Sequence, residues 1–337
     1  MLHSISQSAP TSIAAVLDVK LAPMSDYLAI DVTDGIARIT LNRPGAINAL
    51  DDSMITAMYD ALTTWRNDDS VTAIEIDANG ERGFCAGADV RALADTLTSG
   101  GPWLQFLEAE YALDMMIANY PKPVTSYMRG IAMGGGLGLG AHADRRIVFA
   151  DTVMAMPETK IGIIPDVGIM HQLSRAGAVG RHIALTSATF TGGDALLLNL
   201  ADESADGALP APLFDGTYTW IEECYASDDP VEIVRALESH PDEEARKAGR
   251  DLRARSPFAI HVALRALVRA ERLELSEVLM QDLRLAEGLF PTGDFAEGVR
   301  ALLIDKDNSP RWRHASIEDV PVEEVDKIFA YRSAWKG

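Results

Sequence analysis

Two acidic side chains stand in an otherwise apolar stretch near the middle of the chain. Glu158 follows Met154–Pro157, and Asp166 comes eight residues later, after the run Ile161–Pro165. Burial raises the pKa of a carboxyl group, which suits it to act as a general acid or base near neutral pH. The alternative is a glutamate in a solvated loop and an aspartate that caps the next helix, because Pro165–Gly168 is also a turn signal.

A glycine triplet, Gly134–Gly136, precedes these acids. We expect a strand over Ser126–Ala132, a turn over Met133–Gly136 and then a helix. The N–H groups at a helix start have no partner within the helix and lie at the positive end of its dipole, so they can stabilise an oxyanion. Tight packing between a strand and a helix would explain the glycines equally well.

A second turn of small residues, within 82–91, precedes an expected helix over Val90–Leu97. Its most direct outward N–H group is that of Ala88, just after Gly87. Two amides from separate turns are what a thioester oxygen needs when it becomes negatively charged in a reaction. Cys85 has no histidine partner that the sequence assigns, so a small buried thiol is the favoured interpretation.

Composition excludes several classes of protein. The 337 residues carry a formal net charge of −20, which argues against nucleic acid as a partner. An anionic ligand therefore needs a local basic patch. No apolar run is long enough to span a bilayer, so we expect no membrane partner. Two cysteines are too few for a disulfide framework and favour a reducing, cytoplasmic location.

Strand-strand-helix units recur along the chain, which predicts an α/β fold with a spiral or layered sheet. Turn signals mark a hairpin between Tyr27–Val32 and Ile36–Leu41, and Ser256 with Pro257 marks a helix start. A further helix is expected over Phe295–Ile304. We predict four regions: a flexible N-terminal extension (1–24), a catalytic core (25–200), a variable acidic region of short helices and loops (201–255), and a C-terminal helical region (256–337).

The motifs together resemble the enoyl-CoA hydratase/isomerase (crotonase) superfamily across about residues 27–200. The motifs that carry this resemblance are Leu41–Pro44 with Asn48–Leu50, Gly83–Asp89, Lys122 with Pro123, and Gly130 with the glycine triplet. The segments Met156–Thr159, Pro165–Gly168 and Asp294–Ala301 are most similar to the 3-hydroxyisobutyryl-CoA hydrolase branch. The resemblance implies a crotonase-like spiral of repeated β-β-α units, a C-terminal helical layer, and an acyl-CoA-binding core.

The resemblance also implies a role for each candidate residue. The amides of Ala88 and Gly135 form an oxyanion hole for the thioester, and Glu158 acts as nucleophile or as base for water. Asp166 engages the substrate's 3-hydroxyl group or assists proton transfer, and Glu110 is a further substrate-binding residue. The implied reaction is hydrolysis of 3-hydroxyisobutyryl-CoA in valine catabolism, without metal or redox cofactor, by a homo-oligomer (trimer or hexamer). Spacing does not choose among the candidate cations for the CoA phosphates, which are Arg43, Arg91, Lys122, Lys306 and Arg311.

Position 138 separates the main alternatives. Hydratases of the superfamily use two glutamates, and the first would fall where this chain has Gly138. An enoyl-CoA hydratase/isomerase and a catalytically silent CoA-binding paralogue stay open as alternatives. Residues 136–141 also fit the dinucleotide pattern G-x-G-x-x-A, but a lone match is weak. Ala88 replaces the hydrolases' usual glycine, and Ile169–Gln172 depart from their pattern, so the acyl group stays open.

Overall fold

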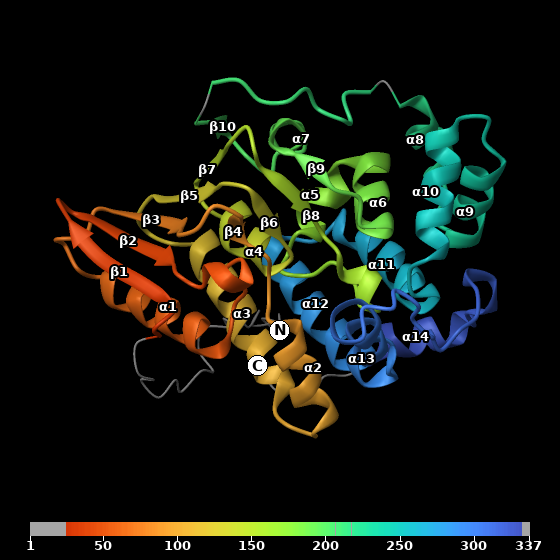
Figure 1. The fold of residues 1–337 in the computed structure, drawn as a ribbon, viewed down its shortest axis with the longest axis horizontal. Coiled ribbons are helices and arrows are strands. Elements are labelled where there is room, and N and C mark those ends of the chain that lie inside the picture. The colour runs from red at the N-terminus through yellow and green to blue at the C-terminus, as the bar shows by residue number, and fades with distance from the viewer. Residues whose placement is uncertain (1–24, 206, 217, 332–337) are drawn as a thin grey trace, which may run out of the picture.

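A computed structural model describes residues 25–205, 207–216 and 218–331. The predicted extension, residues 1–24, lies outside these ranges. Figure 1 shows the N-terminal strands on the left, the remaining strands near the centre, and the helices of the C-terminal half towards the right. In the described ranges no helix combines the length and the apolar character needed to cross a bilayer.

The larger sheet has six strands in the order β1-β2-β3-β5-β7-β10. Its strands are β1 (Leu28–Thr33), β2 (Ile36–Leu41), β3 (Ala73–Ala78), β5 (Val124–Met128), β7 (Arg145–Val148) and β10 (Glu203–Ser204). β1 and β2 pair antiparallel, which confirms the predicted hairpin, and every other pair in this sheet is parallel.

The smaller sheet has the order β4-β6-β8-β9. Its strands are β4 (Gly83–Cys85), β6 (Ile131–Met133), β8 (Val153–Ala155) and β9 (Phe190–Thr191). Three successive pairs, β3/β4, β5/β6 and β7/β8, each place the first strand in the larger sheet and the second in the smaller one. Helical segments follow each pair, so the chain winds as a spiral and confirms the predicted α/β fold of β-β-α units.

The prediction of a single strand over Ser126–Ala132 is wrong. The chain leaves β5 after Met128 and enters the other sheet at Ile131. Gly130 makes this step possible because its φ is +56° and a Cβ there would lie 2.8 Å from the Arg82 carbonyl oxygen. Only glycine adopts such a backbone without strain at so close an approach.

The helical segments between the strands position the candidate site. They are α1 (Asp52–Trp65), α2 (Val90–Thr98), α3 (Trp103–Ala118), α4 (Gly135–Ala141), the 3-10 turn η3 (Glu158–Ile161), α5 (Met170–Arg175) and α6 (Gly177–Thr186). Asp51 caps α1 by accepting a hydrogen bond from the Met54 amide at 2.9 Å. The whole of α4 is buried, and α3 packs against it.

Helices also make up most of the C-terminal half. They are α7 (Gly192–Leu197), α8 (Thr219–Cys224), α9 (Pro230–Ser239), α10 (Glu243–Arg253), α11 (Pro257–Ala270), α12 (Leu275–Leu289), α13 (Asp294–Val299) and α14 (Val322–Ala330). Ser256 caps α11 as predicted, since its hydroxyl accepts from the Ala259 amide. The helix expected over Phe295–Ile304 begins at Asp294 and changes at Arg300 into a π-helical turn, η5. The division into four regions stays a prediction.

Candidate active site

One cavity of about 210 Å³ brings the predicted site residues together. The residues that share its wall are Ala88, Glu110, Gly135, Glu158 and Asp166. They come from five different segments: the turn before α2, the helices α3 and α4, the turn η3, and the loop before α5. The structure therefore places all five in contact with one space, and their chemical roles stay predictions.

The two candidate amides lie close together. Gly87 and Gly135 approach so nearly that a Cβ at Gly87 would lie 3.1 Å from the Gly135 nitrogen. Gly87 has a φ of +91°, which turns the chain so that Ala88 follows beside the start of α4. Among the described residues, neither the Ala88 nor the Gly135 amide donates a backbone hydrogen bond. Two adjacent unpaired donors at a helix start can hold an oxygen that becomes negative.

Glu158 lies on the other side of the same helix start. Its Oε1 atom is 3.0 Å from the position that a Cβ of Gly134 would occupy. Only 5% of Glu158 is exposed, and its Oε2 atom is buried without a hydrogen-bond partner in the described part of the chain. Burial raises the pKa of the Glu158 carboxyl well above its usual range, and the negative charge of Asp166 raises it further. Such a carboxylate is a strong base once it is ionised.

Asp166 is held by a hydroxyl group that the sequence did not single out. The Tyr111 hydroxyl donates a hydrogen bond to Asp166 Oδ2 at 2.6 Å. Burial raises the pKa of Asp166 to about 6, against the lowering effect of this hydrogen bond. Tyr111 follows Glu110 on α3. This helix therefore supplies Glu110, which lines the cavity, and Tyr111, which binds Asp166 on the cavity wall.

The backbone beside Asp166 is strained and anchored from two sides. Val167 has a φ of +49°, which is rare for a β-branched residue and costs free energy. His142 Nε2 lies 2.7 Å from the Val167 carbonyl oxygen, and burial lowers the pKa of His142 to about 4, so the neutral ring donates this bond. The Gly168 amide donates to Asp282 Oδ2 at 3.0 Å. These anchors fix where the Asp166 carboxyl points.

Two further carboxyl groups fill the space between α3 and α4. Glu110 Oε1 is 2.2 Å from the position of a Cβ at Gly135, and both carboxylate oxygens of Asp114 are 2.7 Å from that of a Cβ at Gly138. Asp114 is fully buried, and neither of its oxygens has a hydrogen-bond partner among the described residues. Burial raises the pKa of Asp114 well above its usual range. Gly138 thus makes room for a carboxyl group that α3 supplies.

The remaining candidate motifs have structural roles. The stretch 136–141, which fits a dinucleotide pattern, lies inside the buried helix α4, and a Cβ at Gly136 would lie 2.3 Å from the Cys85 carbonyl oxygen. These glycines pack a helix against a strand and do not form a phosphate-binding loop. Cys85 itself is fully buried, and burial raises the pKa of its thiol to about 12, so it is no nucleophile.

The five candidate cations differ in what they contact. Arg43 forms an ion pair at 2.9 Å, while Arg91 and Lys122 donate to backbone carbonyl oxygens. Lys306 and Arg311 are exposed, and no side-chain hydrogen bond or ion pair of theirs is found in the described ranges. Arg311 nevertheless acts on the Glu297 and Asp307 carboxyl groups and lowers the pKa of both, so its charge is partly engaged.

Comparison with known proteins identifies the family of the chain. A sequence model of the enoyl-CoA hydratase/isomerase family matches residues 36–211 and 205–329. A protein of Gallus gallus named "3-hydroxyisobutyryl-CoA hydrolase, mitochondrial" is 34% identical over 332 residues, covering 88% of this chain and 86% of its own. The corresponding protein of Danio rerio is also 34% identical, over 330 residues, covering 87% of this chain and 86% of its own.

Solved structures agree on the fold. A carnitinyl-CoA dehydratase from Mycobacterium thermoresistibile is 38% identical with a TM-score of 0.87, covering 92% of this chain and 98% of its own. An enoyl-CoA hydratase from Rhodobacter sphaeroides 2.4.1 is 36% identical with a TM-score of 0.85, covering 91% of this chain and 98% of its own. The family match spans most of the chain, and the β-β-α spiral is the fold that the family resemblance implied. The chain belongs to the enoyl-CoA hydratase/isomerase (crotonase) family.

Proposed function

We propose that the protein hydrolyses the thioester of a short 3-hydroxyacyl-CoA, with 3-hydroxyisobutyryl-CoA as the leading substrate. The observation that carries this proposal is the single cavity where Glu158 and Asp166 face two unpaired amides. The names of the relatives from Gallus gallus and Danio rerio support the same substrate. A place in valine catabolism follows from that substrate.

The proposed reaction begins with the thioester oxygen between the amides of Ala88 and Gly135. As Glu158, or a water molecule that it deprotonates, attacks the carbonyl carbon, negative charge grows on this oxygen and the two donors stabilise it. The C–S bond then breaks, and CoA leaves as a thiolate that takes up a proton. If Glu158 attacks directly, water then cleaves the resulting mixed anhydride and frees the acid; if Glu158 acts as base, the attacking water has already supplied the oxygen and the acid is released at once. Asp166 accepts a hydrogen bond from the 3-hydroxyl group and so orients the acyl chain. Glu110 lines the same wall as a further contact.

Several parts of the proposal rest on the family resemblance alone. They are the absence of a metal or redox cofactor and a trimeric or hexameric assembly. The cytoplasmic location that we propose rests on the low cysteine count. The relatives that we compared carry "mitochondrial" in their names. Size-exclusion chromatography with light scattering measures the assembly, and metal analysis of the active protein measures the cofactor content.

A hydratase or dehydratase is the second candidate, and one specific observation favours it. Asp114 places a carboxyl group beside Gly138, the position where hydratases of the superfamily carry their first glutamate. The names of the two structurally similar proteins, a dehydratase and a hydratase, point the same way. Asp114, however, does not line the cavity that Glu158 and Asp166 share. We therefore place hydrolysis first.

A panel of acyl-CoA substrates tests the proposal. We expect release of free CoA thiol from 3-hydroxyisobutyryl-CoA, measured with a thiol reagent, and no loss of the enoyl absorbance of crotonyl-CoA. Loss of that absorbance without thiol release would establish the hydratase instead. Binding of acyl-CoA without turnover of any member of the panel would identify a silent CoA-binding protein.

A further inference from the structure

A second and larger cavity, of about 440 Å³, lies behind the turn that carries Glu158. Its wall is formed by η3, α6, α10 and the segment that leads into α8. It shares no lining residue with the candidate active site. Its volume falls within the range of small-molecule sites. The proposed reaction uses none of its residues, so this cavity needs an explanation of its own.

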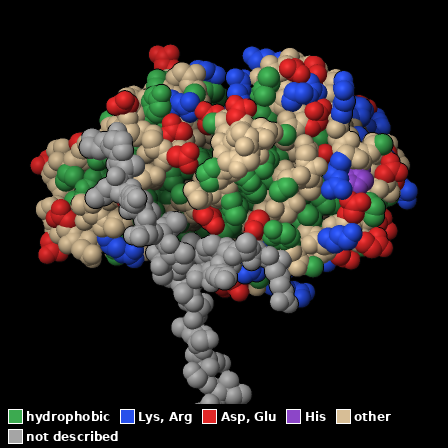
Figure 2. Space-filling view, turned by 90° about the horizontal axis from the view of Figure 1, so that it is seen from below, with side chains coloured by type: hydrophobic (Ala, Val, Ile, Leu, Met, Phe, Trp, Pro, Cys, Tyr) green, Lys and Arg blue, Asp and Glu red, His purple; other side chains and the backbone are tan. Residues whose placement is uncertain are grey.

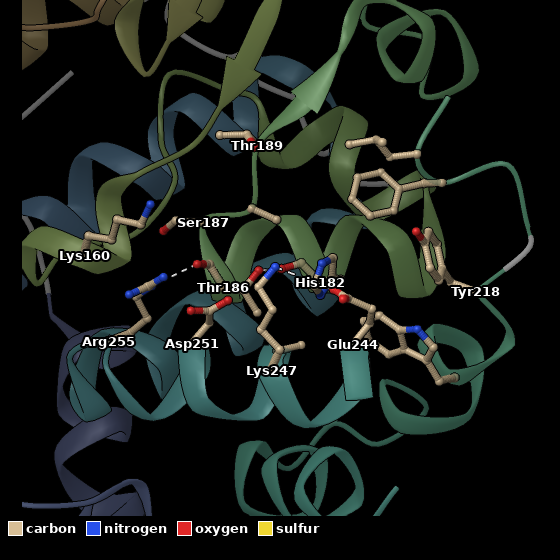
Figure 3. A pocket seen from close by; sticks show the side chains of 15 residues that line it. Lys160, His182, Thr186, Ser187, Thr189, Tyr218, Glu244, Lys247, Asp251 and Arg255 are labelled. Atoms are coloured by element: carbon tan, nitrogen blue, oxygen red, sulfur yellow. Dashed lines mark hydrogen bonds and ion pairs between the residues drawn. The ribbon is translucent and has the colours of Figure 1, made fainter. Parts of the chain in front are cut away.

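One end of this cavity is positively charged. Figure 3 shows Lys160, Ser187 and Arg255 together at that end. The Lys160 ammonium has no hydrogen bond or ion pair among the described residues, and the Arg255 guanidinium has a single hydrogen bond, from Nε to the Thr186 carbonyl oxygen at 2.9 Å. Burial lowers the pKa of both cations, which means that each charge is poorly solvated where it lies. A bound anion would relieve this cost for both.

Neighbouring carboxylates do not cancel this charge. Asp251 acts on Lys160 and Arg255 together, and the Glu158 carboxyl, which lines the other cavity, acts on Lys160 as well. Glu244, the other carboxylate on the wall, lies 3.6 Å from Lys247 and is compensated there. The wall of this cavity thus carries one more cation than carboxylate, in a protein whose net charge is −20. On the face that Figure 2 shows, Lys and Arg side chains are more numerous on the right-hand half than on the left, with Asp and Glu side chains among them.

The other end of the cavity is aromatic. His182 makes edge-on ring contacts with Phe214 and Trp220, with centroids 5.5 Å and 5.4 Å away. His182 is neutral, because burial lowers its pKa to about 4, and its Nδ1 atom lies 2.9 Å from the Tyr225 hydroxyl. Trp220 is 4% exposed, and its indole N–H has no hydrogen-bond partner in the described part of the chain. This end suits the apolar or aromatic part of a ligand, and the indole N–H of Trp220 is available as one hydrogen-bond donor.

We propose that this second cavity binds a small organic anion. Its carboxylate or phosphate group lies between Lys160 and Arg255, and its apolar body packs towards Trp220. Lys160 is two residues from Glu158 in the same 3-10 turn, so this turn separates the second cavity from the candidate active site. This proposal does not depend on the reaction proposed for the active-site cavity, and binding alone tests it.

Isothermal titration calorimetry with four probes tests whether the second cavity binds such an anion. 3-Phenylpropionate and phenyl phosphate carry both a head group and a ring, inorganic phosphate carries the head group alone, and 3-phenylpropanol carries the ring alone. We expect saturable one-to-one binding of at least one of the first two, and weaker or no binding of the others. The choice between the first two shows whether the natural head group is a carboxylate or a phosphate.

Variants and competition then locate the bound probe. Lys160→Met removes a charge without removing any hydrogen bond of the fold, and it should weaken binding at least about tenfold, as loss of one charge-assisted hydrogen bond does. Lys327→Met, at an exposed lysine of α14, is the matched control and should leave the affinity unchanged. The proposal is overturned if no probe binds at millimolar concentration, if Lys160→Met binds as tightly as the parent protein, or if CoA displaces the probe.

Discussion

Removal of one hydroxyl group should move the pH at which the enzyme becomes active. Tyr111 donates a hydrogen bond to Asp166 Oδ2 at 2.6 Å, and Tyr111→Phe deletes this donor while keeping the ring. The bond favours the ionised carboxylate and so lowers the pKa of Asp166, which burial raises to about 6. Without the hydroxyl, only the backbone hydrogen bond at Asp166 opposes the effect of burial, and the pKa rises further.

The size of this change follows from the strength of the bond. A hydrogen bond to a charged group contributes about 1.5–3 kcal/mol, and 1.36 kcal/mol corresponds to about one pH unit. Tyr111→Phe should therefore raise the pKa of Asp166 by about one to two pH units. In the proposed reaction Glu158 and Asp166 must both be ionised, so activity should rise with pH through the titration of this pair, and a higher pKa of Asp166 moves that rise to higher pH. The variant should thus be much slower near pH 6 and approach the parent enzyme at alkaline pH.

The assay is the pH profile of kcat/KM for thiol release from 3-hydroxyisobutyryl-CoA. Tyr127→Phe is the matched control, because the Tyr127 hydroxyl also donates to a carboxylate, Glu75 Oε1 at 3.2 Å, but lies away from the cavity. We expect the acidic limb to move for Tyr111→Phe and to stay in place for the control. An acidic limb that does not move in the Tyr111 variant would refute the assigned link between this hydrogen bond and Asp166.

Two further predictions concern stability. Asp166 has a pKa near 6 when folded and near 4 when unfolded, so its contribution to stability is greatest below about pH 4 and is lost as the pH rises through about 6. Asp166→Asn should therefore raise the melting temperature relative to the parent protein, by more at pH 7.5 than at pH 4. Scanning fluorimetry measures both differences, and equal differences at the two pH values would contradict this prediction. Gly138→Ala places a Cβ 2.7 Å from the Asp114 carboxylate and should lower the free energy of unfolding by about 1–3 kcal/mol in urea. Gly45→Ala, with no heavy atom within 4 Å, is its control, and an equal loss in both variants would show that overpacking is not the cause.

Local signals predicted much of the architecture. The pair Ser256 and Pro257 marks a helix start, because the Ser256 hydroxyl satisfies a backbone donor and proline has no N–H group that could be left unpaired. The order of motifs predicted the repeated β-β-α units. It did not predict that the chain changes sheets at Gly130, because two short strands in sequence have the same pattern as one longer strand.

The site was predictable only in part. Glu158 and Asp166 stand out because acids in an apolar stretch are uncommon. Tyr111 and Asp282 do not, because the hydrogen bond to Asp166 spans 55 positions and the bond from Gly168 to Asp282 spans 114. Contacts at such separations arise when helices pack on the sheets, and no local pattern marks them. The four-residue spacing from Glu110 to Asp114 is the one local signal for the buried carboxyl group of Asp114, since it puts both residues on one face of α3.

The central claim is that Glu158 acts on a carbonyl group that the amides of Ala88 and Gly135 hold. The most direct measurement compares Glu158→Gln with the parent enzyme, using kcat for thiol release and the Kd of 3-hydroxyisobutyryl-CoA from calorimetry. Because the amide keeps the size of the side chain but cannot act as base or nucleophile, we expect kcat to fall by about 10²–10⁴ while Kd stays within about threefold. If instead Kd rises sharply while turnover of bound substrate is retained, Glu158 is a structural residue and does not act on the carbonyl group.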